Sequence, residues 1–508
     1  MSRDSRFQDF EAISASSSSR KPAKSVIAAL LGVLLLVNLA GSLYQLPLNR
    51  VVERRLCREF YEQHDPSKIG PDGGVVEELC KVDTVQQDLG RIQGALDTIW
   101  IVGDFVMTIP LGFVAERYGR RAVLWLNLAP RIFMLIWAVL VGYFNHLLPT
   151  KAILAGPILS FLGGDCVFNS ITYSLAASTT DDYVLRASYF GYMSSISYVV
   201  NLLGPALAST SMTLLLWLPF YIGTVLLLIA IPVIYMLPDH GASSIRQDEQ
   251  AEPLLSSPLL KAQDSEHSAL QSVANRFRTL KTVLASHPRN FSLLLICFLL
   301  ASLASSDTKL LVQYISKRYH WTFASAGYLL SGKAVVNFTL LTVIVPRVLA
   351  SAAHDDSRVG DELAGLSDRI NMRFANLCFA ASVVGALAIA FSVTIWLLVP
   401  ALLVYALGSA LPIFTLSLLK SPSVSVTTPG SPNDVDGRMP QSMGDAETHV
   451  FSVVMLVKTL GSLLGAPLMA VLWVQGIGLG GIALGLPYFV SGGCYIVAII
   501  VFSRIVIG

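Results

Sequence analysis

Long apolar stretches with almost no charge are the feature that most constrains what this chain can fold into. Stretches of about 20 residues recur from Val26 to the C-terminus, and each could cross about 30 Å of hydrocarbon as a helix. Lipid offers the backbone no hydrogen-bond partners, so long spanning segments of this kind must satisfy their own N–H and C=O groups as helices. The pattern predicts an all-α integral membrane protein.

The positions of these stretches predict twelve transmembrane helices in two six-helix halves. The predicted spans are 25–48, 94–115, 122–143, 151–177, 187–208, 212–237, 291–315, 324–349, 374–393, 395–419, 449–474 and 478–502. The predicted domains are a disordered cytosolic tail (1–24), an N-terminal bundle (25–237), a cytosolic linker (238–290) and a C-terminal bundle (291–508). Within the linker, apolar residues spaced by three and four between Leu270 and Leu284 predict an amphipathic helix, either on the inner membrane face or packed under the bundle.

The distribution of charge predicts the orientation in the membrane. Only 14% of residues are charged, against about 25% in an average soluble domain, and a net charge of +2 gives no reason to expect nucleic-acid binding. The short loops that would lie outside hold almost no Lys or Arg, so both termini are expected to be cytosolic. Loop 49–93 would then lie outside the cytosol, where Cys57 and Cys80 could form a disulfide.

One short motif follows the second predicted span. It reads Gly112-Phe-Val-Ala-Glu116-Arg117-Tyr-Gly119-Arg120-Arg121. This resembles the signature loop of the major facilitator superfamily, G-x-x-x-D-R-x-G-R-R, at every position except Glu116, where Asp is usual. The glycines suit a close helix approach and a tight turn, and the arginines suit a cytosolic surface with helix C-termini and anionic lipid.

A weaker copy of this motif stands between the eighth and ninth predicted spans. Ala364–Arg373 retains Asp368-Arg369 and has Asn371 in place of the second glycine, as expected for a fold built from two related halves. The resemblance implies a transporter with two pseudo-symmetric bundles. The long outer loop with two cysteines also resembles fungal members related to the proton-coupled folate and heme-carrier branch.

Eight ionisable residues fall within the predicted spans: Asp97, Asp104, Arg131, Asp165, Asp307, Lys309, Lys333 and Lys458. Each costs about 2.5–3.5 kcal/mol near the centre of a helix in lipid, so they should face the protein interior or water. Four acids and four bases allow full pairing. We expect Asp104 to pair with Arg131 of the neighbouring span in a structural or gating contact.

The resemblance also implies which residues contact the solute or proton, because the first, fourth, seventh and tenth helices of this superfamily line its central cavity. Asp165, Asp307 and Lys309 are then the leading candidates. Asp307 and Lys309 are two residues apart and should point to different sides of their helix. Further candidates on the predicted spans are Lys333, Asn169, Gln45 and Tyr314.

The motifs of competing protein classes are absent from the sequence. It contains no HExxH, CxxC or P-loop, and no pair of histidines stands mid-membrane to ligate haem. We therefore expect no enzymatic activity, no cofactor and no metal site, and a gradient rather than ATP would supply the energy. We predict a monomer in the plasma membrane that exports a small organic solute by proton exchange. The alternatives are proton-coupled import of an organic anion and a non-transporting receptor.

Overall fold

The computed structural model describes residues 4–71, 73–144, 147–177, 179, 183–237, 289–344, 347, 363–418 and 442–505. Within these ranges all regular structure is helical, and each of the twelve predicted spans coincides with a helix or a run of short helices. Nine of the described helices are long and apolar enough to cross a membrane. The prediction of an all-α membrane protein is confirmed.

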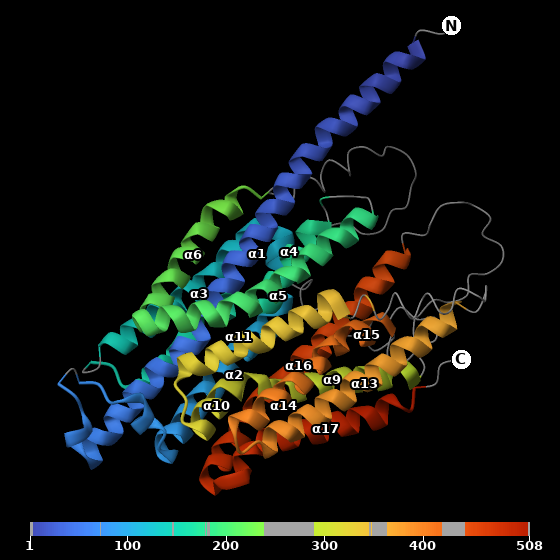
Figure 1. The fold of residues 1–508 in the computed structure, drawn as a ribbon. Coiled ribbons are helices and arrows are strands. Elements are labelled where there is room, and N and C mark those ends of the chain that lie inside the picture. The colour runs from blue at the N-terminus through green and yellow to red at the C-terminus, as the bar shows by residue number, and fades with distance from the viewer. Residues whose placement is uncertain are drawn as a thin grey trace, which may run out of the picture. The chain divides into compact units, whose positions relative to one another are not determined.

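The helices of the first half of the chain are α1 (Asp4–His64), α2 (Asp83–Tyr118), α3 (Arg120–Tyr143), α4 (Asp165–Ala177), α5 (Tyr183–Leu214) and α6 (Leu218–Tyr235). Those of the second half are α9 (Arg289–Ala304), α10 (Leu311–Tyr319), α11 (Phe323–Thr339), α13 (Leu363–Phe391), α14 (Ile395–Leu407), α15 (Leu411–Leu418), α16 (Ser442–Leu479) and α17 (Leu486–Phe502). Figure 1 shows these elements in chain order by colour.

Two predicted segments outside the spans have different outcomes. Helix α1 begins at Asp4, so the segment 4–24, predicted to be a disordered tail, is helical. Extending a helix that the apolar residues have already nucleated costs far less than starting one, which accounts for the difference. The amphipathic helix predicted between Leu270 and Leu284 lies outside the described residues.

The chain forms two compact units whose boundaries differ from the predicted six-plus-six division. The first unit comprises residues 1–51 and 102–261, and the second comprises 52–101 and 262–508. Helices α1 and α2 therefore each contribute to both units, because the unit boundaries fall inside them. Residues 52–101, which connect the first two spans, pack with the second half of the chain.

Each unit is held together by contacts between apolar helix faces. In the first unit α3 packs against α4 and α6, and α5 packs against α4 and α6. In the second unit α9 packs against α16 and α17, while α13 packs against α14, α15 and α17. The largest fully buried side chains are aromatic, including Phe220 in the first unit and Trp473 and Tyr488 in the second.

The end of α1 and the segment that follows it form a small apolar core of their own. Cys57 and Cys80 are joined by a disulfide that spans 23 residues of sequence. Both cysteines are fully buried beside Tyr61, Val75 and Val85. The disulfide fastens the end of α1 to the short 3₁₀ helix η2 (Glu77–Cys80).

We expect the substitution Cys57→Ser to loosen this segment. Closing a loop of this length stabilises the folded form by about 2–4 kcal/mol, mainly by restricting the unfolded chain. Proteolysis through the opened form should accelerate by roughly one hundredfold, because cleavage follows the population of that form. Cleavage between residues 57 and 80, followed by mass spectrometry, measures this. Cys494→Ser, which removes a free thiol in α17, is the control and should not change the rate; equal rates for both variants would contradict the prediction.

Candidate functional site

Breaks inside the fourth, seventh and tenth spans place several of the ionisable candidates. The fourth span is a 3₁₀ helix, η3 (Thr150–Leu162), followed by two glycines and then α4. The seventh is α9, the 3₁₀ segment η4 (Ser305–Leu310) and α10. The tenth is α14, η6 (Gly408–Ala410) and α15. In membrane transporters such discontinuous helices typically form the solute and ion sites.

In the first unit, side chains from neighbouring helices hydrogen-bond to backbone groups at the break in the fourth span. The carboxylate of Asp104 in α2 accepts the N–H of Cys166 at 3.1 and 3.0 Å. The amide of Asn127 in α3 donates to the carbonyl of Gly164 at 2.8 Å. A Cβ on Gly164 would collide with the Asp104 carboxylate, so only glycine fits between this carboxylate and α4.

An ion pair on the same break corrects one prediction. Arg131 of α3 donates to Asp165 Oδ1 at 2.6 Å and to Asn127 Oδ1 at 3.1 Å. The sequence-based expectation paired Arg131 with Asp104. That carboxylate instead caps α4 through the N–H of Cys166, and the guanidinium binds the carboxylate that begins α4. The Arg131 side chain is 11% exposed and that of Asp165 is 57% exposed, so the carboxylate is the accessible member of the pair.

The other candidates of the first unit lie apart from this ion pair. Asn169 is exposed one helical turn after Asp165 on α4, and Gln45 is half-buried on α1. One turn beyond Asn169, the hydroxyl of Tyr173 lies 3.1 Å from that of Ser194 on α5. Asp165, Asn169 and Tyr173 therefore share one face of α4, with a spacing of four residues.

In the second unit, the break in the seventh span buries a carboxylate. Asp307 is fully buried, and the hydroxyl of Tyr405 from α14 donates to both of its oxygens at 2.9 and 3.1 Å. The ammonium of Lys333 from α11 lies 5.2 Å from the centre of the Tyr405 ring, where it also exerts a charge interaction on Asp307. Ser491 and Tyr495 of α17 adjoin the carboxylate and the tyrosine. We call Asp307, Tyr405 and Lys333 the Asp307 cluster.

A close helix crossing positions Tyr405 in this cluster. Gly385 of α13 meets α14 at that point, and a Cβ on this glycine would lie 2.5 Å from the Tyr405 Cα. Because the obstructing atoms belong to the backbone, a larger residue would push the two helices apart. The short distance from Tyr405 to Asp307 therefore depends on a glycine on a third helix.

Lys309 and Tyr314, the remaining candidates of the seventh span, have different surroundings. Asp307 is buried whereas the Lys309 side chain is 42% exposed, as their two-residue spacing predicted. Lys309 Nζ lies 3.9 Å from Asp97 Oδ1, a loose ion pair. Tyr314 is fully buried and donates to the carbonyl of Ile389 at 2.8 Å, so it fastens α10 to α13.

Sequence reasoning named no residue of the twelfth span, although its polar side chains surround the cluster. Tyr488, Ser491 and Tyr495 follow one another at spacings of three and four on α17, which places them on one face. That spacing was the available signal. Asn127 was also missed, since an isolated Asn in an apolar span gives no indication of its partner.

The motif after the second span caps another helix. Gly119 has a positive φ of 93° and separates α2 from α3. The Arg121 guanidinium donates to the carbonyl of Tyr235 at 2.6 Å and to that of Leu237, at the C-terminus of α6. A cation is favourable there because the last carbonyls of a helix carry partial negative charge.

Most other positions of the two motif segments lie outside the part of the chain whose side chains are described, including Gly112, Glu116, Arg117, Asp368 and Arg369. The second segment, Ala364–Arg373, lies within α13. It is therefore helical, and not the loop that its similarity to the first motif had predicted. Asn371, in place of the motif's second glycine, permits this continuation because it does not require a positive φ.

Comparison with known proteins identifies the family. The sequence profile of the Major Facilitator Superfamily matches residues 82–429. The chain belongs to the major facilitator superfamily. Among its relatives are the MFS efflux pump atnC of Emericella nidulans, 24% identical over 94% of this chain and 86% of the relative, and the efflux pump ustT of Aspergillus flavus, 26% identical over 63% of this chain and 62% of the relative.

Solved structures agree on the fold. The human organic anion transporter MFSD10 (TETRAN) matches with a TM-score of 0.56 and 16% identity, covering 95% of this chain and 99% of the other. The nucleoside transporter NupG matches with a TM-score of 0.54 and 14% identity, covering 94% of this chain and 98% of the other. The superfamily prediction and the expectation of a transporter rather than an enzyme are confirmed. The relation to the folate and heme-carrier branch stays a prediction.

We expect Asp104→Ala to destabilise the protein by about 1–2 kcal/mol, the usual cost of losing a side-chain cap at a helix N-terminus. Asp104→Asn retains an oxygen acceptor and should cost less. Thermal unfolding of the purified protein in detergent measures both. The control is Asp88→Ala, which removes an exposed carboxylate paired with Arg91 and should stay within about 0.5 kcal/mol of wild type. Equal losses for the Ala and Asn variants would show that Asp104 does not act through the cap.

Proposed function

We propose that this transporter is a gradient-driven exporter, which moves a small organic solute outward in exchange for protons, with Asp307 as the proton-carrying group. The observation that carries the proposal is the burial of this carboxylate in the break of the seventh span, with Tyr405 donating to it. A buried carboxylate must be paired or protonated. Its ionised form is stabilised by Tyr405 and by the positive charge of Lys333, and its protonated form would release Lys333 from this interaction.

This difference between the two protonation states could couple proton binding to movement. Three helical elements meet at the Asp307 cluster, namely the seventh span, α11 and α14. A change in the charge of Asp307 alters the contacts that hold them, and a proton can shift a conformational equilibrium only through such differential contacts. Solute binding on the same helices would then respond to the occupancy of the proton site.

The first unit would contribute the solute-contacting residues. Asp165 presents an accessible carboxylate that is held in place by Arg131, and Asn169 stands one turn away on the same helix. An exposed carboxylate in a membrane-spanning segment must face water rather than lipid, which supports a place beside the solute path. We also propose that Gln45 on the first span and Lys309 on the seventh span contact the solute.

The outward direction is supported by the names of two relatives, atnC and ustT, which are both described as efflux pumps. The disulfide supports an orientation in which loop 49–93 lies outside the cytosol, because disulfides persist in oxidising compartments. Both termini would then be cytosolic. We propose the plasma membrane as the site of action and a monomer as the working form.

A second candidate function is proton-coupled import of an organic anion. It is favoured by two lysines, Lys333 of the Asp307 cluster and Lys309 of the seventh span, which could balance the negative charge of an anionic solute. The structural similarity to an organic anion transporter shows a shared fold and agrees with either direction. A receptor that moves no solute is the third candidate, and solute flux distinguishes it from the other two.

We expect Asp307→Asn to abolish transport driven by a pH gradient while solute exchange without a gradient continues. The amide cannot release or take up the proton, but it keeps the size and an acceptor for Tyr405. Proteoliposomes containing the pH-sensitive dye pyranine measure proton flux, with rhodamine 6G and fluorescein as cationic and anionic test solutes. One unit of pH gradient supplies about 1.4 kcal/mol per proton, enough for about a tenfold concentration ratio.

The control for this experiment is Asp88→Asn, which changes an exposed carboxylate of α2 and should transport as wild type does. If Asp307→Asn still couples solute movement to the proton gradient, another group carries the proton. If dye accumulates inside vesicles in the direction of proton entry, import replaces export. Absence of flux for every organic solute tested, with the protein folded, would favour the receptor.

A further inference from the structure

Residues 53–83, here called the cap, link the first two spans but belong structurally to the second unit. The unit boundaries fall after Val51 in α1 and after Ile101 in α2. The cap is therefore covalently continuous with the first unit through two helices, while its contacts lie with residues 262–508. A relative movement of the two units must either bend α1 and α2 near these boundaries or break the contacts of the cap.

The cap is built to resist internal deformation. Beneath the disulfide, Lys81 and Glu53 form an ion pair of 2.6 Å, with their side chains 1% and 0% exposed. The amide of Gln86 donates to the same Glu53 oxygen at 2.6 Å and to the carbonyl of Cys80 at 3.0 Å. Separating the two members of such a buried pair would leave an uncompensated charge, which is costly. We therefore expect the pair to stay together and the cap to move as a rigid body.

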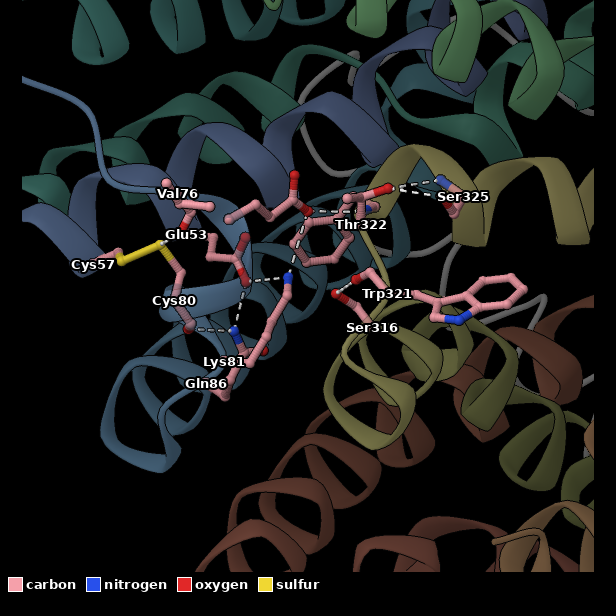
Figure 2. A network of polar contacts seen from close by, with 12 residues as sticks. Glu53, Cys57, Val76, Cys80, Lys81, Gln86, Ser316, Trp321, Thr322 and Ser325 are labelled. Atoms are coloured by element: carbon pink, nitrogen blue, oxygen red, sulfur yellow. Dashed lines mark hydrogen bonds and ion pairs between the residues drawn. A yellow bond between two sulfur atoms is a disulfide. The ribbon is translucent and has the colours of Figure 1, made fainter. Parts of the chain in front are cut away.

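Two charged residues of the cap grip the corner between α10 and α11. Glu77 Oε1 accepts the N–H of Phe323 at 2.8 Å, and this residue is the first of α11. A carboxylate at this end satisfies a backbone donor that the helix cannot satisfy itself and complements the helix dipole. The Lys81 ammonium lies 4.4 Å from the centre of the Phe323 ring. Figure 2 shows Lys81 reaching from the buried pair toward this corner.

A third contact ties α10 to the cap from the other side of the corner. Lys317 donates to Asp83 Oδ1 and to the carbonyl of Lys81, both at 2.5 Å. Within the corner, Ser316 donates to the carbonyl of Trp321 at 2.7 Å, which holds the turn closed. The cap and the corner thus meet through charge-assisted bonds, which are stronger than neutral ones when dry but can be exchanged for water.

The corner joins two of the three helical elements that carry the Asp307 cluster, and the third is α14 with Tyr405. Asp307 lies in η4 immediately before α10, and Lys333 lies on α11 after the corner. The cap therefore holds the connection between the proposed proton-carrying residue and its cationic neighbour. This places Glu77 and Lys81 in a position to influence the cluster without touching it.

We propose that the cap is a latch on the outer side of the carrier, which grips the α10–α11 corner and releases it as one unit whenever the outer side opens. Glu77 and Lys81 are the positioning residues of this latch. The proposal requires transport by alternating access but neither export nor proton exchange. In the latched form the corner is fixed, and in the released form η4 and α11 gain freedom together.

Hydrogen–deuterium exchange on the full-length protein in lipid nanodiscs tests the release. Glu77→Ala removes the acceptor for Phe323 and should accelerate exchange by roughly ten- to one hundredfold, both in the first turn of α11 and in cap residues 75–83. Glu77→Gln keeps an acceptor oxygen and should fall between Glu77→Ala and wild type. Glu78→Ala, which changes the neighbouring exposed carboxylate, is the matched control and should exchange as wild type does.

Coupled acceleration of the two segments supports the latch, since a released unit exposes both. Acceleration confined to the first turn of α11 would reduce Glu77 to an ordinary helix cap and overturn the proposal. Equal effects of Glu77→Ala and Glu78→Ala would also overturn it. Unchanged thermal unfolding of the variants confirms that the exchange reports release rather than a general loss of stability.

Locking the latch tests its role in transport. In the wild-type protein the charged ends of Asp83 and Lys317 are in contact. A short bismaleimide can therefore join the two cysteines of the double variant Asp83→Cys with Lys317→Cys. The joined protein should carry neither rhodamine 6G nor fluorescein, whereas each single variant treated with the same reagent should carry whatever wild type carries. Persistent flux in the joined protein would overturn the latch. If wild type carries neither dye, the proposed function fails separately and the exchange experiment alone decides.

Discussion

The requirement that every backbone polar group find a partner within the protein governs the rest of this structure. A continuous helix meets it automatically in lipid, and an interrupted helix does not. Where the fourth span breaks, Asp104 supplies the missing partner for the N–H of Cys166. Asn127 adds a second donor to the carbonyl of Gly164, which also accepts the N–H of Phe168. The polar side chains around that break therefore stabilise the interrupted helix, whatever further role they have in transport. Without these hydrogen bonds the span could not be interrupted within the membrane.

The intramembrane charges follow the same requirement. Arg131 meets Asp165, Lys309 lies near Asp97, and Asp307 accepts from Tyr405 with Lys333 close by. Each of these acids therefore has its own form of compensation, ranging from a tight ion pair to hydrogen bonds from hydroxyl groups with a lysine nearby. The most deeply buried of these carboxylates, Asp307, is compensated by Tyr405, Ser491 and the nearby charge of Lys333. A residue in this situation is sensitive to small movements of its neighbours, which suits the proton-carrying role that we propose for it.

The sequence predicted the spans well and their interior contacts poorly, for separate reasons. An apolar stretch of fixed length is a local signal, and the described helices agree with all twelve stretches. Which residues of two helices meet depends on the rotation of each helix about its axis and on its depth in the membrane, and single residues do not encode either. For this reason Arg131 was predicted to pair with Asp104, although it meets Asp165. The break of the fourth span at Gly163 and Gly164 was not predicted either. The contacts of Lys81 with Phe323 and Lys317 were beyond reach, because nothing local connects residues so distant in the chain.

That separation has a consequence for how the protein is made. Lys81 and Lys317 are 236 residues apart, so at a translation rate of about 5–20 residues per second the cap waits roughly 10 to 50 seconds before its corner is synthesised. During this interval Glu77 and Asp83 lack their partners on α10 and α11, whereas the disulfide joins residues only 23 positions apart and needs nothing from downstream. Assembly of the molecule would then proceed from an already folded cap to a late step in which the cap docks on the corner. Truncated nascent chains should accordingly be recognisable by an oxidised but undocked cap.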